Sequence, residues 1–187
     1  MHVKTRYKPK WFNHRCAFAA LLILAVESLF AADHVAALDV DVPKVRLDAP
    51  TFTLHNLVGG ETALADFAGK VVLLNFWATW CAPCREEMPA MQQLWERYRA
   101  RGFVIVAVAA DRGNQDQVAA FVAKHELSYP VLLDPEGDVR NRYEVSVLPT
   151  SYFIARDGRI SGRVIGIRDW DSPEADTVVT RLLAIEK

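Results

Sequence analysis

Residues 70–77 read K-V-V-L-L-N-F-W, and residues 78–87 continue with A-T-W-C-A-P-C-R-E-E. The first stretch is a continuous apolar run, which predicts a β-strand buried on both faces of a sheet. The second leads into a helix expected from about Pro83 to Arg101, where apolar residues recur every three to four positions until Gly102 ends the pattern. A buried strand therefore ends just before two cysteines, and a helix begins at them.

The alternation of strand and helix continues on both sides of this unit. Apolar stretches predict strands, and amphipathic stretches bounded by turn or capping residues predict helices. This order, which ends in an antiparallel hairpin and a helix, predicts an α/β fold with a mixed central sheet flanked by helices. We expect strands at 51–54, 103–108, 130–133, 151–154 and 160–165, a helical turn at 64–67, and helices at 116–125, 138–143 and 172–185.

The first 37 residues predict an export signal. A basic stretch ends at Arg15 and eleven apolar residues follow at 16–26, which is the order found in a secretory signal peptide. Two alternatives stay open: cleavage after the small residues that end at Ala37, or retention of residues 16–32 as a membrane anchor. Both alternatives place the rest of the chain in an extracytoplasmic compartment such as the periplasm.

Length and charge limit the number of domains and the kinds of partner expected for the rest of the chain. A chain of 187 residues accommodates one domain of ordinary size, which we expect at 51–187, after a charged, proline-containing linker at 38–50. The chain has 22 Lys and Arg against 23 Asp and Glu, and five of the basic residues lie in the first 37. The domain is therefore acidic overall, which argues against nucleic acid as a partner.

Cys81 and Cys84 are the only cysteines of this domain, and their spacing allows a metal half-site, a structural staple or a redox couple. Zinc needs four ligands, and the domain adds only His55 and His125, neither at ligand spacing. A disulfide that closes so short a loop adds little stability. A helix N-terminus stabilises an anion, and the thiolate is the attacking form of cysteine. The residues therefore favour a redox couple, with the Cys81–Cys84 disulfide as its redox group and no metal or other cofactor.

The run at 71–89, together with V-S-V-L-P-T-S-Y-F-I at 145–154, resembles the thioredoxin superfamily. More narrowly, it resembles the exported TlpA/ResA-like thiol–disulfide oxidoreductases, over about residues 45–187. The resemblance implies a thioredoxin-like fold with an extra strand–helix unit. This unit is expected after the CxxC motif and before the strand that follows the family's cis-proline.

The resemblance also implies roles for individual residues. Cys81 corresponds to the attacking thiolate and Cys84 to the resolving thiol, while Pro149 matches the proline that is cis in the family and faces the disulfide. Beside that proline, the backbone is expected to pair with an extended substrate segment as a short strand. The substrate contacts expected on this basis are Trp80, Pro83, Leu148, Pro149 and Thr150.

Two positions depart from thioredoxin itself. Asn75 stands on the strand where thioredoxin carries a buried, proton-handling Asp, and Asn75 cannot titrate. Glu87 lies three residues after Cys84, on the same face of the expected helix, and matches the acid of the ResA-like branch. We hypothesise that Glu87 accepts the proton of Cys84; the alternative is a solvated glutamate on the helix surface. For Trp80, the alternative is a core aromatic residue.

The resemblance implies a reductase of disulfides in exported proteins, recharged by a membrane thiol-electron carrier and supporting cytochrome c or metalloprotein maturation. V-L-P-T at 147–150 replaces the Gly-Thr-Pro-Glu of the cytochrome c branch, which weakens a dedicated haem-attachment role. An oxidase that inserts disulfides uses the same residues and stays open. A thiol peroxidase needs Thr where this chain has Ala78, and a copper-handling module uses CxxxC spacing, so both are disfavoured.

Overall fold

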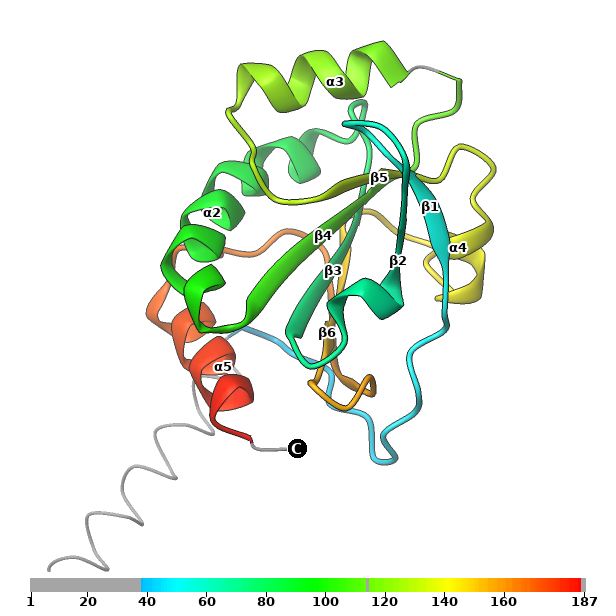
Figure 1. Cartoon of the computed structure of the whole chain (residues 1–187). Helices are drawn as coiled ribbons and strands as arrows, with labels where there is room; N and C mark the ends of the chain where they lie inside the picture. The colour runs from blue at the N-terminus through cyan, green and yellow to red at the C-terminus, as the bar shows by residue number, and fades with distance from the viewer. Residues whose placement is uncertain (1–37, 114, 186–187) are drawn as a thin grey trace, which may run out of the picture. The chain divides into compact units, whose positions relative to one another are not determined.

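The computed structural model describes residues 38–113 and 115–185 (Figure 1). Its strands are β1 Thr53–Asn56, β2 Glu61–Ala63, β3 Val71–Trp77, β4 Phe103–Ala109, β5 Val131–Leu133, β6 Thr150–Ile154 and β7 Ile160–Ile165. Its helices are α2 Ala82–Tyr98, α3 Gln115–Lys124, α4 Asp138–Arg142 and α5 Pro173–Ala184, with 3-10 helices η1 Leu64–Phe67 and η2 Arg99–Arg101. The strands form one seven-stranded sheet in the order β2-β1-β5-β4-β3-β6-β7. β3 pairs in parallel with β4 and antiparallel with β6, so it lies inside the sheet.

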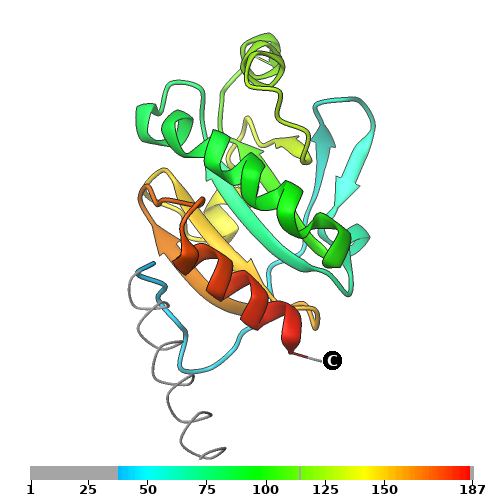
Figure 2. The same cartoon turned by 90° about the vertical axis from the view of Figure 1, so that its left-hand side faces the viewer.

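The side chains of β3 alternate between the two faces of the sheet. Leu73 and Trp77 join an apolar cluster with residues of α2, α3 and α5, whereas Val72 and Phe76 join a second cluster with residues of α4 and η1. Figure 2 shows α2 and α5 side by side over one face. Because both faces are covered, every residue of β3 is buried, which explains the unbroken apolar run. The alternation places Asn75 on the face of Leu73 and Trp77, beneath α2.

The expected α/β fold with a mixed sheet flanked by helices is confirmed, and β5 with α4 forms the extra unit ahead of β6. Two details differ from expectation. The first strand is Thr53–Asn56, because these are the residues that pair with β2 and β5. The strand Glu61–Ala63 was not expected, since three residues with one apolar side chain carry no periodic signal. It pairs with β1 across Gly59 and Gly60, whose φ angles of 104° and 75° suit glycine.

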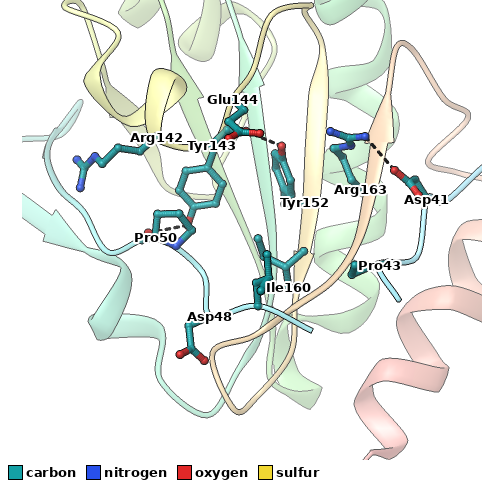
Figure 3. Close-up of a pocket in the computed structure, with 11 residues that line it drawn as sticks. Asp41, Pro43, Asp48, Pro50, Arg142, Tyr143, Glu144, Tyr152, Ile160 and Arg163 are labelled. Carbon is teal, nitrogen blue, oxygen red and sulfur yellow. Dashed lines mark hydrogen bonds and ion pairs between the residues drawn. The ribbon is translucent and has the colours of Figure 1, made fainter. Parts of the chain in front are cut away.

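The segment expected to be a linker, residues 38–50, belongs to the same compact unit as the sheet. Arg163 on β7 donates to the Asp41 carboxylate at 2.9 Å, and the two residues also form a β-bridge. The Tyr143 hydroxyl donates to the Pro50 carbonyl at 2.8 Å. Figure 3 shows this segment running along a pocket that Tyr143, Tyr152 and Ile160 line on the side of the sheet.

The signal peptide or anchor expected at residues 1–37, with its apolar part at 16–32, lies outside the described residues. Within 38–113 and 115–185, no helix is both long enough and apolar enough to cross a membrane. Cleavage or anchoring therefore stays a prediction.

Gly162 on β7 is a point of close approach between the sheet and segment 38–50. A Cβ built on Gly162 would lie 2.5 Å from Cγ1 of Val40, closer than such atoms approach in proteins. We predict that Gly162→Ala lowers the free energy of unfolding by about 1–3 kcal/mol, because the segment must shift away from the sheet. Val40→Ala should relieve the clash, so the double variant should be more stable than the two single effects predict. Urea denaturation of the four proteins measures this coupling, and simple additivity would contradict it.

Candidate active site

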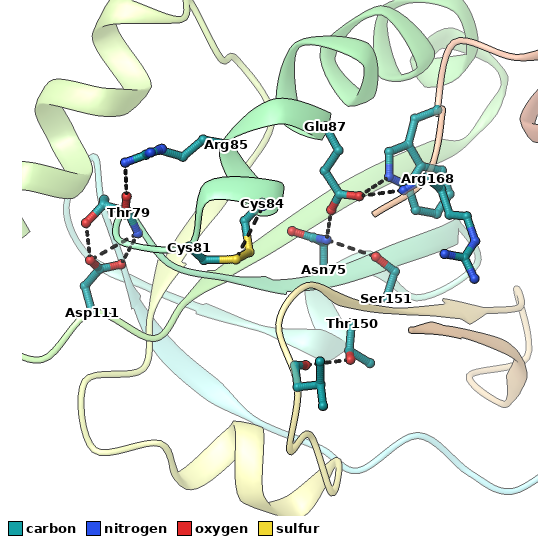
Figure 4. The surroundings of a disulfide bond; sticks show 12 residues. Asn75, Thr79, Cys81, Cys84, Arg85, Glu87, Asp111, Thr150, Ser151 and Arg168 are labelled. Atoms are coloured by element: carbon teal, nitrogen blue, oxygen red, sulfur yellow. Dashed lines mark hydrogen bonds between the residues drawn. A yellow bond between two sulfur atoms is a disulfide. The ribbon is translucent and has the colours of Figure 1, made fainter. Parts of the chain in front are cut away.

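Cys81 and Cys84 lie where β3 has ended and α2 begins, and they form a disulfide with Cα atoms 5.3 Å apart (Figure 4). Cys81 is the N-cap of α2, and its Sγ accepts a hydrogen bond from the Cys84 backbone N–H at 3.3 Å. The helix is 17 residues long, and its positive N-terminal end stabilises a thiolate at this position. Cys81 is 6% exposed and Cys84 is fully buried. This difference favours Cys81 as the attacking thiol and Cys84 as the resolving thiol.

A carboxylate holds the loop that joins β3 to the disulfide. Asp111 accepts hydrogen bonds from the Thr79 backbone N–H, at 3.0 Å to Oδ2, and from the Thr79 hydroxyl. Arg85 donates to the Thr79 carbonyl at 3.0 Å. β3 and β4 are parallel and Trp77 pairs with Ala109, so the residues just beyond both strand ends meet. Figure 4 shows this anchor on the side of the disulfide away from Asn75.

Glu87 lies on the buried face of α2, with only 2% of its surface exposed, so the alternative of a solvated surface glutamate is wrong. Its Oε2 accepts hydrogen bonds from Trp170 Nε1 at 2.9 Å and from the Arg168 backbone N–H at 3.2 Å. Its Oε1 accepts one from Asn75 Nδ2 at 3.1 Å. Asn75 Nδ2 also donates to Ser151 Oγ at 2.9 Å, so the network joins β3, α2, β6 and the loop before α5.

Burial raises the pKa of Glu87 from 4.5 to about 7, because a carboxylate loses its hydration in this environment. The hydrogen bonds from Trp170, Arg168 and Asn75, together with the nearby Arg168 charge, favour the ionised form and offset part of this effect. Glu87 therefore changes its protonation state near neutral pH, unlike an exposed glutamate.

The Leu148–Pro149 peptide bond is cis, as expected. Pro149 is buried, and Leu148 is partly exposed just before β6. Thr150 is the first residue of β6 and pairs with Phe76 on one side and Ile165 on the other. Its backbone is therefore part of the sheet, which corrects the expectation that Thr150 pairs with a substrate segment. Leu148 precedes the cis-proline and is partly exposed, and its pairing with a substrate segment stays a prediction.

Trp80 is 65% exposed, so the alternative of a core aromatic residue is wrong. It directly precedes Cys81 and therefore stands at the edge of the site. Pro83 lies in the first turn of α2, between the two cysteines, and is partly exposed. Both residues lie next to Cys81, and their contact with a substrate stays a prediction.

The sequence did not reveal Asp111, Ser151 or Trp170. Asp111 follows the carboxyl end of a parallel strand, and the tendency of α/β proteins to build sites at that edge is a signal that points to it. Trp170 lies 83 residues after its partner Glu87, in the loop between β7 and α5, and no local pattern marks it. Ser151 sits within an apolar strand and meets Asn75 only through the pairing of β3 with β6.

Residues 45–163 match the model of the AhpC/TSA family. This chain belongs to that family. It is similar to the thiol-disulfide oxidoreductase ResA of Oceanobacillus iheyensis, with 40% identity over 175 residues that cover 91% of this chain and 90% of the relative.

Solved structures of related proteins share the fold of this AhpC/TSA family member. A thiol:disulfide interchange protein of the thioredoxin family from Chlorobium tepidum is 31% identical, with a TM-score of 0.65, covering 76% of this chain and 99% of that one. A secreted thiol-disulfide isomerase from Corynebacterium glutamicum is 26% identical, with a TM-score of 0.70, covering 78% and 92%. The predicted resemblance to the thioredoxin superfamily and its ResA-like branch is thereby confirmed. The Cys81–Cys84 pair is the redox centre of a thiol–disulfide oxidoreductase.

The raised pKa of Glu87 predicts how the stability of the oxidised protein depends on pH. The folded protein binds this proton more tightly than the unfolded chain, so the contribution to stability is complete below pH 4.5 and is lost as the pH rises through about 7. The loss is on the order of 3 kcal/mol, since a tenfold change in proton affinity corresponds to about 1.4 kcal/mol. Chemical denaturation between pH 4 and 8 should therefore show a fall in stability that Glu87→Gln abolishes. Glu86→Gln, on the exposed side of α2, is the control and should keep the fall.

Proposed function

We propose that this protein is an extracytoplasmic reductase of disulfides in exported proteins, working through Cys81 and Cys84 with no other cofactor. The observation that carries the proposal is the buried Glu87, whose pKa of about 7 suits proton exchange with the buried Cys84 on the same face of α2. Export is supported by the basic and apolar order of the first 37 residues and by similarity to a secreted isomerase. The protein is then soluble after cleavage or tethered through residues 16–32.

The first step is attack on a substrate disulfide. The Cys81 thiolate, stabilised at the N-terminus of α2, bonds to one substrate sulfur and breaks the substrate S–S bond. The departing substrate sulfur takes the electron pair of that bond and then a proton. The product is a mixed disulfide between Cys81 and the substrate.

The second step resolves the mixed disulfide. Glu87 in its ionised form accepts the proton of the Cys84 thiol, and the Cys84 thiolate attacks Sγ of Cys81. This closes the Cys81–Cys84 disulfide and releases the second substrate thiolate, which takes up a proton. Two electrons have then passed from the protein to the substrate, and the proton stays on Glu87 until the pair is reduced again.

Asn75 links the two groups that exchange this proton. Its Nδ2 donates to Glu87, and Figure 4 shows the amide between Glu87 and the disulfide. Its Oδ1 is buried and, among the described residues, accepts no hydrogen bond while the cysteines are oxidised. Reduction gives Cys84 an S–H donor, and Asn75 Oδ1 is the buried acceptor on that side. Asn75 therefore acts as a positioning residue between Cys84 and Glu87.

The substrate docks on apolar surface around the cis-proline. Val147 and Ile165 are about half exposed, and Ile167 is exposed nearby. The Gly166 backbone N–H donates to the Pro149 carbonyl at 2.8 Å, which holds the Ile165–Ile167 turn against the cis-proline. An extended, partly unfolded segment of an exported protein fits such a surface, because it supplies both apolar side chains and free backbone groups.

The oxidised protein must be reduced after each turnover. A membrane thiol-electron carrier is the partner that this cycle requires on the outer side of a membrane, and cytochrome c or metalloprotein maturation is the process that we assign to it. A redox titration tests the direction: a potential below about −200 mV supports the reductase, whereas one near −120 mV would establish the oxidase instead.

Removal of the resolving thiol should trap the substrate. Cys84→Ser keeps the Cys81 thiolate but blocks the second step, so mixed disulfides with exported proteins should accumulate in cells. Non-reducing gels followed by mass spectrometry detect them. The Cys81→Ser, Cys84→Ser double variant is the control and should trap nothing; an equal yield from both variants would rule out the exchange mechanism.

The pH profile of exchange tests the role of Glu87. The rate of disulfide reduction by the reduced wild-type protein should rise through a pKa near 7, because the ionised carboxylate is the proton acceptor. Glu87→Gln should lose this inflection and slow resolution by about 10- to 100-fold. Trp170→Phe removes a hydrogen bond that favours the ionised form, so it should move the inflection to higher pH. A profile unchanged by both substitutions would mean that Glu87 has no part in proton transfer.

A further inference from the structure

A pocket opens beside the disulfide, on the side of the β4 carboxyl end. It is lined by Trp80, Ala110, Asp111, Arg112, Gln117 and Arg140. Trp80 directly precedes Cys81, and Asp111 holds the backbone of Thr79, so the wall of this pocket is continuous with the loop that carries the attacking sulfur. Consecutive Cα atoms are about 3.8 Å apart, which puts the pocket within reach of a substrate residue next to the attacked cysteine.

Two arginines of this pocket lack partners. In the part of the chain that the structure describes, neither Arg112 nor Arg140 has a side-chain hydrogen bond or ion pair, and Nε of Arg140 is buried without an acceptor. The Arg140 guanidinium lies over Gly137, where a built Cβ would be 3.5 Å from Nη2. Other arginines, by contrast, form ion pairs with carboxylates: Arg46, Arg97, Arg159, Arg163 and Arg168.

The pocket retains a positive charge after its own acid is counted. Asp111 is the one carboxylate in the lining, and both of its oxygens accept hydrogen bonds from Thr79. Two arginines therefore line the pocket with this single, already bonded carboxylate. Arg112 is exposed, whereas Arg140 is partly buried and its Nε has no acceptor among the described residues, which is unfavourable. A carboxylate ligand removes that cost and matches the planar guanidinium with paired hydrogen bonds.

We propose that the Arg112–Arg140 pocket binds an acidic side chain of the substrate protein, within a few residues of the cysteine that Cys81 attacks. This rests on the proposed function, because it names a substrate feature for the same disulfide exchange. The pocket would distinguish acidic from basic sequences around the target disulfide, whereas the apolar surface near the cis-proline accepts either. Trp80 lines the arginine pocket and directly precedes Cys81.

Two disulfide-bonded peptides that differ only in charge provide the test. One carries Glu and the other Lys on both sides of the reactive cysteine, and the second-order rate constant for their reduction by the reduced protein is measured. The wild-type protein should reduce the Glu peptide about tenfold faster, mainly through a lower KM, and this preference should shrink as salt screens the charges. Arg112→Glu should abolish or invert the preference, and Arg140→Gln should reduce it to about threefold or less.

Arg181→Gln is the matched control, because it removes one positive charge from an exposed site in the last turn of α5. The neighbouring Leu183 carbonyl contacts Arg156, whose guanidinium also bonds Gly69 ahead of β3, so this turn lies at the opposite end of the sheet from the disulfide. The control should keep the full preference for the Glu peptide. Equal rates for both peptides in the wild type would overturn the proposed role of the pocket. So would a loss of preference in the control as large as that in the Arg112 and Arg140 variants. Failure to reduce either peptide would instead contradict the proposed function.

Discussion

β3 is buried on both faces, and the alternation of its side chains places the polar group of Asn75 under α2 rather than under α4. The same strand then delivers the chain to the N-terminus of α2, where Cys81 caps the helix. Cys84 and Glu87 follow on one face of that helix, three residues apart, and this face turns toward β3. The register of β3 therefore determines how the site is arranged: the Asn75 amide lies between the disulfide and the Glu87 carboxylate.

A carboxylate in this position is costly, and the way the fold accommodates it explains the chemistry. Glu87 sits in a cluster of apolar side chains, so its charged form loses hydration, yet three hydrogen bonds keep that form accessible. The donors come from β3 and from the loop between β7 and α5, which are distant in sequence. If these donors were absent, burial alone would raise the pKa further and leave a neutral acid. If the site were open to water, the pKa would return to the ordinary range of a glutamate, too low to hold a proton at neutral pH.

The unit formed by β3 and α2 was predictable from the sequence, because an unbroken apolar run and a capped, periodic helix are local signals. The cis-proline and the roles of the two cysteines followed from the resemblance to thioredoxin, not from the residues alone. What the sequence could not provide were contacts made by pairing and packing across long separations. Trp170 reaches Glu87 only after β6 and β7 have been added to the sheet, and Asp111 reaches Thr79 only because β4 lies parallel to β3. The commitment of Thr150 to the sheet likewise depends on strands on both sides of it.

The site divides its tasks between two sides of the disulfide. On the side of α5 lie the buried, hydrogen-bonded groups that we propose for proton transfer. On the side of the β4 carboxyl end, the exposed Trp80 and Arg112 and the partly buried Arg140 line the pocket that we propose for an acidic substrate side chain. In the proposed mechanism, a pKa near 7 lets Glu87 both accept a proton when Cys84 attacks and return it when the disulfide is reduced again. A proton held inside the protein through that cycle would let the surface on the other side vary with the substrate without disturbing the exchange chemistry.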